Sequence, residues 1–310
     1  MINRDDVFAA REAIGGRLHR TPIFSSATLG PRVFLKAELF QRTGSFKPRG
    51  VLNSLSRLSR EERRSGVIAA SAGNHAQAVA YGAALEGLDA LLVMWRTASP
   101  AKIAATRGYG AEVDLEADGP SVVFDRLDEV RERTGRTLIH PFDSEHTMAG
   151  QGTVGLEIEE DVPYVDVVVV PIGGGGLISG IATALPDVRI VGVEPRVSTA
   201  MTAALESGKP VPVEARSVAD GLNAPFAGKR PLRVLHERGI EVVLVEEDEI
   251  EAAMRLLYER AKLACEPAGA AAVAALMTRK APVEEDETVV CVVSGGNVAA
   301  ETAAAILARP

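Results

Sequence analysis

The stretch that decides the fold is Val165-Asp-Val-Val-Val-Val-Pro-Ile172, followed by Gly173-Gly174-Gly175-Gly176 and by Leu177-Ile-Ser-Gly-Ile-Ala-Thr-Ala184. The unbroken β-branched run predicts a strand that is buried on both faces. The apolar residues after the four glycines predict a helix that packs back onto that strand. A strand, a glycine turn and a helix in this order are typical of the parallel sheet of an α/β protein.

The same alternation of β-branched runs and helical stretches extends along the chain. Strands are expected over Val33–Lys36, Val67–Ala70, Ala90–Met94, Glu112–Leu115, Val165–Val170, Arg189–Val193, Glu241–Val245 and Thr288–Val293. Helices are expected over Asp5–Ile14, Arg49–Leu58, Asn74–Leu85, Pro100–Tyr109, Ser121–Thr134, Thr147–Glu159, Leu177–Ala184, Asp248–Ala264 and Pro267–Met277. The pattern predicts an α/β protein in which a small domain, 50–142, is inserted into a large domain made of 1–49 and 143–310.

Composition narrows the class of protein. Of the 310 residues, 46% are hydrophobic and 25% are charged, which is typical of a soluble globular protein and excludes wholesale disorder. The 34 basic and 42 acidic residues leave a net charge of −8, so nucleic acid and anionic membranes are not expected as partners. Two cysteines cannot build a disulfide framework, and the N-terminal residues lack the apolar core of a signal peptide. A cytoplasmic protein is expected.

Gly173–Gly176 form the strongest candidate ligand site. Backbone N–H groups without a Cβ beside them can surround a phosphate at the positive end of a helix. A tight turn without a ligand is the plain alternative. A dinucleotide site is a second alternative, because Glu194 ends the next strand where a ribose-binding acid is expected, although Ile178 or Ser179 replaces the third glycine of that motif.

Lys47 is the candidate nucleophile within Thr43-Gly-Ser-Phe-Lys-Pro-Arg-Gly50. Pro48 suits the first turn of a helix, which places Lys47 at the helix N-terminus. The helix dipole disfavours a cation there and so lowers the pKa of the amine toward the neutral form that a Schiff base requires. A solvated surface lysine is the alternative for this residue taken alone.

Two further loops follow expected strands. Ser71-Ala-Gly-Asn-His75 offers backbone donors and polar side chains for a carboxylate, with simple helix capping as the alternative. Ser294-Gly-Gly-Asn297 follows the last strand, where a lone serine is usually a turn residue. Because ligands of α/β sheets gather at the carboxyl ends of strands, we expect these loops to share one site.

Together these motifs resemble the fold type II family of pyridoxal-phosphate enzymes, and most closely its serine/threonine dehydratase and serine racemase branch. The resemblance extends from His19-Arg-Thr-Pro22 to Ser294-Gly-Gly-Asn297. It implies a fold like that of the tryptophan synthase β-subunit, with two open twisted sheets flanked by helices. It also implies pyridoxal 5'-phosphate as the cofactor and a homodimer or homotetramer.

The resemblance implies two sets of site residues. Lys47 would bind the cofactor covalently and act as the catalytic base. Phe46 would lie against the pyridine ring of the cofactor, Asn74 would form a hydrogen bond to the 3-hydroxyl of that ring, and Ser294 would meet the ring nitrogen. The phosphate of the cofactor would be held by Gly173, Gly174, Gly175 and Gly176. The substrate carboxylate would be received by Ser71, Asn74 and His75 with the backbone amides of their loop.

The reaction implied is β-elimination from a hydroxy-amino acid, which converts L-threonine to 2-oxobutyrate or L-serine to pyruvate, with release of ammonia. A serine racemase, a 3-hydroxyaspartate-type dehydratase and, from another class, a nucleotide-binding oxidoreductase remain alternatives. Ala72 stands where serine racemases carry a second serine, which disfavours racemisation.

Two further expectations concern what is missing. Some relatives bind a divalent cation through a glutamate, a backbone carbonyl and an aspartate. In this chain Glu194 and Ser198 occupy the first two positions, but Ala200 stands in place of the aspartate, so no metal is expected. Only thirteen residues follow Asn297, so inhibition by isoleucine through a C-terminal regulatory domain is not expected.

Overall fold

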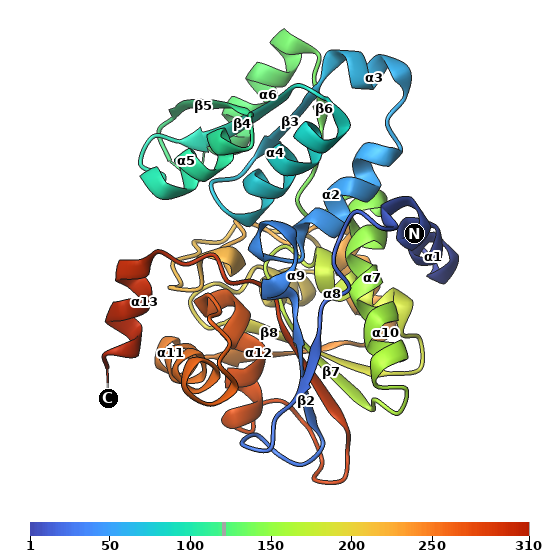
Figure 1. Cartoon of the computed structure of the whole chain (residues 1–310), viewed down its shortest axis with the longest axis vertical. Helices are drawn as coiled ribbons and strands as arrows, with labels where there is room; N and C mark the ends of the chain where they lie inside the picture. Colours follow the sequence, from blue (N-terminus) through green and yellow to red (C-terminus); the bar gives the residue numbers. More distant parts are fainter. Residues whose placement is uncertain (120–121, 310) are drawn as a thin grey trace.

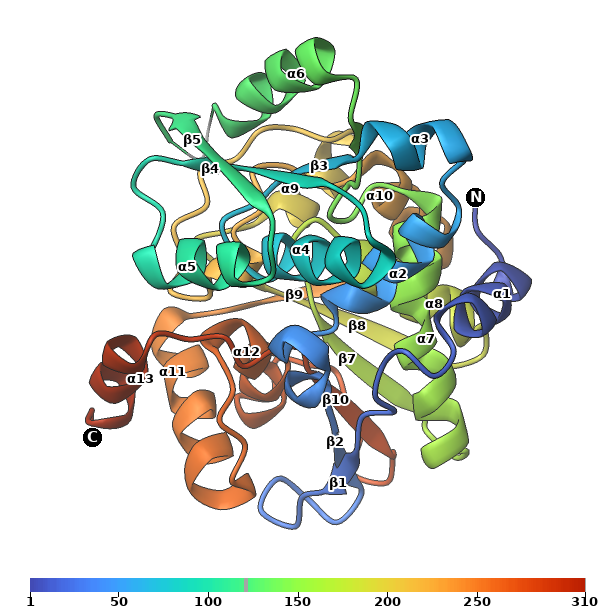
Figure 2. The same ribbon diagram turned by 45° about the horizontal axis from the view of Figure 1, so that its top comes forward.

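The computed structural model describes residues 1–119 and 122–309. Two β-sheets lie one above the other, with helices on their faces and between them (Figures 1 and 2). Within the described residues, none of the helices has the length and apolar character needed to span a bilayer.

The larger sheet has six strands and contains the valine-rich stretch that precedes Gly173. Its order is β1 (Ile23–Ser25), β2 (Val33–Ala37), β10 (Val289–Val293), β7 (Val167–Pro171), β8 (Arg189–Pro195) and β9 (Glu241–Val245). All neighbouring strands are parallel except β1, which pairs antiparallel with β2 at the edge. The expected buried central strand is confirmed, since every residue of β7 is buried.

The smaller sheet has four parallel strands. Its order is β5 (Glu112–Ala117), β4 (Ala90–Trp95), β3 (Val67–Ala70) and β6 (Thr137–Leu138). It is built from residues 67–138 alone, as the strand pattern predicted. The domain boundaries at residues 50 and 142 stay a prediction.

Thirteen α-helices cover the two sheets within the described residues. They are α1 (Arg4–Ile14), α2 (Lys47–Ser56), α3 (Arg60–Ser65), α4 (Asn74–Glu86), α5 (Pro100–Gly108), α6 (Val123–Thr134), α7 (Glu145–Asp161), α8 (Gly176–Ala184), α9 (Ala200–Ser207), α10 (Lys229–Arg238), α11 (Glu247–Leu256), α12 (Pro267–Met277) and α13 (Ala300–Leu307). Short 3₁₀ turns η1 (Glu38–Phe40), η2 (Arg42–Gly44) and η3 (Asp220–Leu222) occupy loops between them.

The core follows the two-residue period of the strands. Val167 and Val169 pack with the alanine-rich α12 and with α11, whereas Val168 and Val170 point to the opposite face and pack with α7, α8 and α10. The smaller sheet is covered in the same way, by α2 and α4 on one face and α6 on the other. Both faces of both sheets are therefore buried, as parallel sheets require.

All eight expected strands are present, and the remaining elements show where the pattern failed. β1 and β6 were not expected, because two or three residues cannot establish a period. α3, α9, α10 and α13 were also not expected. The helix expected over Asp248–Ala264 instead runs over Glu247–Leu256 and continues as a π turn over Leu257–Ala261. The start expected at Ser121 lies outside the described residues, and α6 is described from Val123.

Candidate functional site

A cavity of about 690 Å³ lies between the two sheets. Its walls come from the segments that follow β2, β3, β7 and β10, so the carboxyl ends of strands from both sheets face it. The cavity brings together all the predicted site residues, namely Phe46, Lys47, Ser71, Asn74, His75, Gly173, Gly174, Gly175, Gly176 and Ser294. Their predicted roles remain predictions.

Lys47 is the first residue of α2 and reaches into this cavity. Its Nζ lies 3.2 Å from the carbonyl oxygen of Pro141, to which it donates, and 5.0 Å from the centre of the Phe46 ring. The turn before α2 is anchored to the last strand, because the amide of Phe46 donates to the carbonyl oxygen of Ser294 at 3.2 Å. This bond fixes Lys47 and Ser294 on neighbouring walls.

The environment of Lys47 makes its amine a better nucleophile. Burial lowers the pKa of Lys47 from 10.5 to about 8, and the carboxyl group of Glu266 opposes this shift only in part. At neutral pH about a tenth of the amine is then neutral, compared with less than a thousandth at the ordinary pKa of a lysine. The sequence-based expectation of a lowered pKa therefore agrees with the structure, with desolvation as the largest cause.

We expect the reaction of Lys47 with an aldehyde to follow this pKa. In cofactor-free protein, the rate at which borohydride traps an adduct of pyridoxal 5'-phosphate on Lys47 should rise with pH through a midpoint near 8, because only the neutral amine attacks. Peptide mapping after trapping at pH 6 to 10 measures the profile, with the exposed Lys229 in the same digest as the comparison. A Lys47 profile that still climbs steeply above pH 9.5 would contradict this assignment.

The glycine loop joins β7 to α8, and within the described residues its backbone amides at Gly173–Gly176 have no backbone acceptor. The first helical hydrogen bond runs from the Ser179 amide to the Gly175 carbonyl, so the amides of Gly173–Gly176 precede the helical ladder. The backbone needs glycine here, since Gly175 has a φ of +94° and a Cβ on Gly174 would lie 2.3 Å from the Phe142 ring. The loop thus offers a cluster of N–H groups at a helix N-terminus, an arrangement that is able to bind an anion.

The loop after β3 leads into α4, and its side chains Ser71 and His75 bond to different parts of the structure. The hydroxyl of Ser71 accepts from the Gly73 amide at 3.1 Å, while His75 turns inward and places Nε2 2.8 Å from the Ile139 carbonyl oxygen. A carbonyl accepts only from a protonated nitrogen, so Nε2 carries the proton and Nδ1 is an acceptor. Burial, with Lys47 close by, lowers the pKa of His75 to about 3. The neutral ring cannot attract a carboxylate by charge, so the side chain of His75 is not suited to the predicted role.

Asn74 belongs to a chain of amide and carboxyl groups along the cavity wall. Asn297 Nδ2 donates to the Thr43 carbonyl at 2.6 Å and to Asn74 Oδ1 at 2.8 Å. Asn74 Nδ2 in turn donates to Glu266 Oε1 at 2.6 Å. These bonds orient the Asn74 side chain and leave its second N–H available. Burial raises the pKa of Glu266 to about 8, with Asp220 adding to the rise.

Several cavity residues escaped the sequence analysis. Pro141, Phe142 and Gln151 line the cavity, and Gln151 Oε1 is buried without a hydrogen-bond partner among the residues that the structure describes. Pro141 and Phe142 follow β6, the two-residue strand whose pattern is too short to be read. Gln151 lies within α7, where its sequence neighbours give no signal.

The dinucleotide alternative requires Glu194 as a ribose-binding acid, but the structure places this carboxylate at the start of α9 instead. Its carboxylate accepts from the amides of Met201 at 2.7 Å and Thr202 at 2.9 Å, and from the Thr202 hydroxyl at 2.7 Å. These bonds hold the first turn of α9. Glu194 is fully buried there and does not line the described cavity, so the site lacks the ribose-binding acid that a dinucleotide enzyme needs.

The residues present fit pyridoxal phosphate. A Cβ on Gly174, Gly175 or Gly176 would lie less than 3 Å from neighbouring protein atoms, so only glycine lets the backbone of this loop take its path along the cavity and offer its amides to a phosphate group. Lys47 supplies an amine of lowered pKa for the aldehyde. The Ser294 hydroxyl lies 3.5 Å from its nearest acceptor, the Ala268 carbonyl oxygen, and is therefore weakly engaged. Phosphate donors, an amine and a neutral hydroxyl thus face one cavity.

Comparison with known proteins gives the same result. Residues 15–295 match the family model described as "Pyridoxal-phosphate dependent enzyme". The chain is 42% identical over 307 residues to the L-threonine ammonia-lyase of Thermotoga maritima, with 96% of this chain and 76% of that protein covered. It is 41% identical to the catabolic L-threonine dehydratase of Escherichia coli, with 95% and 92% covered.

Solved structures extend the likeness to the fold. Maize serine racemase superposes with a TM-score of 0.92 at 36% identity, covering 97% of this chain and 95% of that one. A threonine deaminase of tomato, Solanum lycopersicum, superposes with a TM-score of 0.90 at 34% identity, covering 99% and 89%. The fold class expected from the sequence, two open sheets flanked by helices, is confirmed.

Proposed function

The chain belongs to the family of pyridoxal-phosphate dependent enzymes, and from this premise we propose that it converts hydroxy-amino acids to 2-oxo acids and ammonia, with L-threonine as its first substrate and L-serine as its second. The β-hydroxyl and the α-proton leave as water, and one water is taken up again when the resulting enamine hydrolyses, so ammonia is the only net co-product. The products are 2-oxobutyrate from threonine and pyruvate from serine. The single observation that carries the proposal is the cavity in which Lys47, the glycine loop and the Ser71–His75 loop face one another.

Each wall of the cavity performs a separate task. Pyridoxal phosphate, when bound, supplies the electron sink that makes the α-proton of an amino acid acidic. Gly173–Gly176 bind the phosphate through their amides, and the amides of the Ser71–His75 loop bind the substrate carboxylate. Lys47 takes the α-proton on Nζ, which its lowered pKa allows near neutral pH. Ser294 meets the ring nitrogen as a neutral partner and leaves that nitrogen without a counter-charge.

A substrate panel tests the proposal. Purified protein loaded with pyridoxal phosphate is assayed for release of 2-oxo acid from L-threonine, L-serine, 3-hydroxyaspartate and L-alanine, the last lacking a leaving group. We expect threonine to be turned over fastest, serine next and alanine not at all. Fastest release from 3-hydroxyaspartate would move the assignment to that dehydratase, and no release from any hydroxy-amino acid would refute the elimination activity.

Racemisation has its own test, since solved relatives include serine racemases. Ala72 is buried beside the cavity and carries no group that can deliver a proton to the second face of the substrate. We therefore expect no D-serine when L-serine is converted to pyruvate. Chiral chromatography of the quenched reaction measures this, and D-serine at more than about one part in a hundred of the pyruvate formed would assign a racemase activity.

We also propose that the enzyme is a cytoplasmic homodimer or homotetramer. One feature that supports assembly is the edge of the larger sheet, where Phe24 and Phe40 stack edge to face at 6.3 Å although each is more than two-fifths exposed. Light scattering of the loaded protein measures the assembly.

A further inference from the structure

Four charged side chains are buried together behind α2, on the side away from the cavity. This buried charge cluster consists of Lys36 on β2, Glu38 in η1, Arg49 on α2 and Glu157 on α7. Lys36 and Glu38 are 0% exposed, Arg49 is 2% and Glu157 is 9%. Two positive and two negative charges make the cluster neutral, and none of these residues lines the described cavity.

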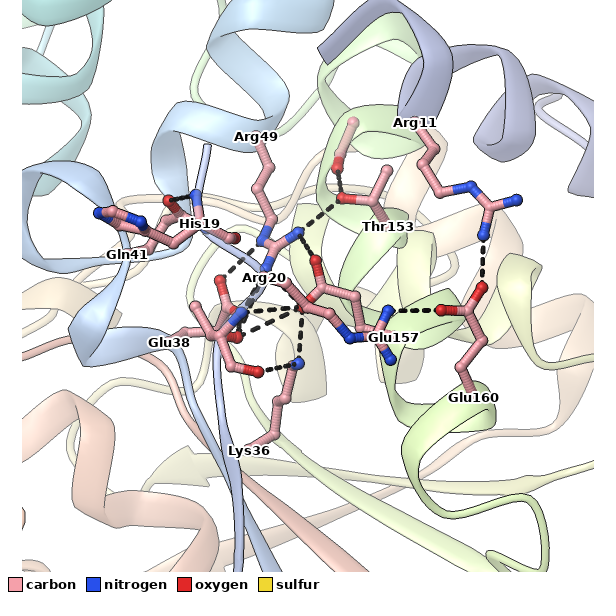
Figure 3. Close-up of polar contacts among 12 residues, drawn as sticks. Arg11, His19, Arg20, Lys36, Glu38, Gln41, Arg49, Thr153, Glu157 and Glu160 are labelled. Atoms are coloured by element: carbon pink, nitrogen blue, oxygen red, sulfur yellow. Dashed lines mark hydrogen bonds and ion pairs between the residues drawn. The ribbon is translucent and has the colours of Figure 1, made fainter. Parts of the chain in front are cut away.

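Arg49 lies at the centre of the cluster (Figure 3). Its guanidinium group donates to both carboxylate oxygens of Glu38, at 2.8 Å each, and to both of Glu157, at 2.7 and 2.9 Å. Lys36 Nζ completes the arrangement by donating to Glu157 Oε2 at 2.6 Å. A further bond links Arg49 to the Thr153 hydroxyl at 3.2 Å. Arg49 thus uses its rigid fork on two carboxylates at once, a geometry that lysine cannot reproduce.

Such a cluster is poor evidence for stability. Buried ion pairs lose much of their attraction to desolvation, and apolar side chains of similar volume often stabilise a protein equally well. What the cluster does supply is a fixed geometry. It ties α2 to β2 and η1 on one side and to α7 on the other.

The position of Arg49 on α2 links this geometry to the cavity. Lys47 and Arg49 are two residues apart in one helix, so their side chains project about 200° apart around its axis. The first turn of α2 therefore directs Lys47 into the cavity and Arg49 into the cluster. A shift of this turn that disturbs Arg49 must also move Lys47.

Helix α7 connects the cluster to the glycine loop. Its backbone packs against α2, since a Cβ on Gly150 would lie 2.3 Å from the Arg49 carbonyl oxygen. Two residues along, it packs as tightly against α8, since a Cβ on Gly152 would lie 2.7 Å from the Gly180 carbonyl oxygen. Helix α8 begins at the glycine loop. α7 is therefore a common wall that sets how far Lys47 stands from Gly173–Gly176.

We propose that the buried charge cluster is a positioning device that fixes Lys47 relative to the glycine loop, with Arg49 as its central positioning residue. The inference rests on the proposed roles of Lys47 and the loop as the two anchors of the cofactor. Its consequence is specific. The phosphate of the cofactor speeds the reaction of its aldehyde with Lys47 only if the distance between Lys47 and the glycine loop fits this one rigid molecule. Loosening the cluster should therefore remove the increase in rate that the phosphate provides.

Two aldehydes separate this effect from a loss of stability. The full chain, freed of cofactor, reacts with pyridoxal 5'-phosphate or with pyridoxal, which lacks the phosphate. In both reactions Lys47 Nζ bonds to the aldehyde carbon and one water leaves, and borohydride then traps the adduct. The measured quantity is the ratio of the two trapping rates at Lys47, together with the melting temperature of the unliganded protein.

We expect Arg49→Lys to lower this ratio by at least about tenfold, through a slower reaction with pyridoxal 5'-phosphate and an almost unchanged one with pyridoxal. Glu157→Gln should lower it in the same direction. The matched control is Arg126→Lys, which alters an ion pair to Asp114 at 2.7 Å beside the smaller sheet, where neither residue lines the described cavity. Its ratio should stay within about twofold of the wild type even if its melting temperature falls.

A milder variant protects the test against misfolding. Thr153→Val keeps every charge and replaces a hydroxyl by a methyl group. The hydroxyl accepts a hydrogen bond from Arg49 and donates one to the Gly150 carbonyl oxygen in the same helix. The variant should therefore fold and still lower the ratio of the two trapping rates measurably. An unchanged ratio in every folded cluster variant, or equal slowing with both aldehydes, would overturn the positioning role. Different results would contradict the proposed roles of the two anchors. Wild-type protein that forms no adduct on Lys47 would contradict the role of Lys47, and wild-type protein that shows no preference for the phosphorylated aldehyde would contradict the role of the glycine loop.

Discussion

Replacing Lys47 by alanine is expected to lower the turnover of L-threonine by at least about 10⁴-fold. The variant loses the amine that takes the α-proton, and a positioned acid or base alone contributes about 10²–10⁴-fold. It also loses the covalent anchor of the cofactor, which adds to the effect. The cavity wall should persist, because the Nζ of Lys47 makes one hydrogen bond, to the Pro141 carbonyl oxygen, within the described residues.

The spectrum and the trapping reaction measure this prediction independently of activity. Wild-type protein should show a visible absorbance that borohydride removes, with the trapped adduct on Lys47, whereas Lys47→Ala should show neither. Lys229→Ala is the matched control, since Lys229 is exposed at the start of α10 and its replacement should change nothing. A borohydride-trapped adduct on another lysine in Lys47→Ala would assign the covalent role to that residue instead.

Replacing Gly174 by alanine is expected to weaken the binding of pyridoxal 5'-phosphate by about 10- to 100-fold. The new Cβ would lie 2.3 Å from two atoms of the buried Phe142 ring, so the loop or the ring must move. Loss of one charge-assisted hydrogen bond from a displaced amide costs about 1.5–3 kcal/mol, which corresponds to that range. Overpacking itself should lower the free energy of unfolding by about 1–3 kcal/mol.

Comparison of two ligands assigns the loss to the phosphate. Binding of pyridoxal, which has no phosphate, should change little in Gly174→Ala, while binding of the phosphorylated form falls. Gly108→Ala is the control, because a Cβ at this exposed position of α5 meets no atom within 4 Å. Equal weakening for both ligands would show that the substitution acts on the cavity as a whole rather than on a phosphate site.

Much of the site was predictable because its chemistry is local. The glycine loop, Lys47 at a helix start and the Ser71–His75 turn each occupy a strand end or a helix start that the residue pattern marks. Parallel strands then place such ends at one edge, so a shared site follows from the pattern. The orientation of His75 was not predictable, because its partner is the Ile139 carbonyl, 64 residues away in the sequence.

The sequence by itself determined the architecture and placed the proposed anchors of the cofactor at a helix start and a strand end, since strand period, glycine freedom and helix capping act over a few residues. Burial, which is the largest cause of the lowered pKa of Lys47, comes from the tertiary structure. The tertiary structure alone decided which distant groups complete the site. Pro141 and Gln151 enter the cavity behind a strand too short to show a period, and Glu266 meets Asn74 across 192 residues. The buried charge cluster is the extreme case. Lys36, Arg49 and Glu157 each resemble surface charges in sequence, and only the packing of α2 and α7 removes them from water and makes their pairing necessary.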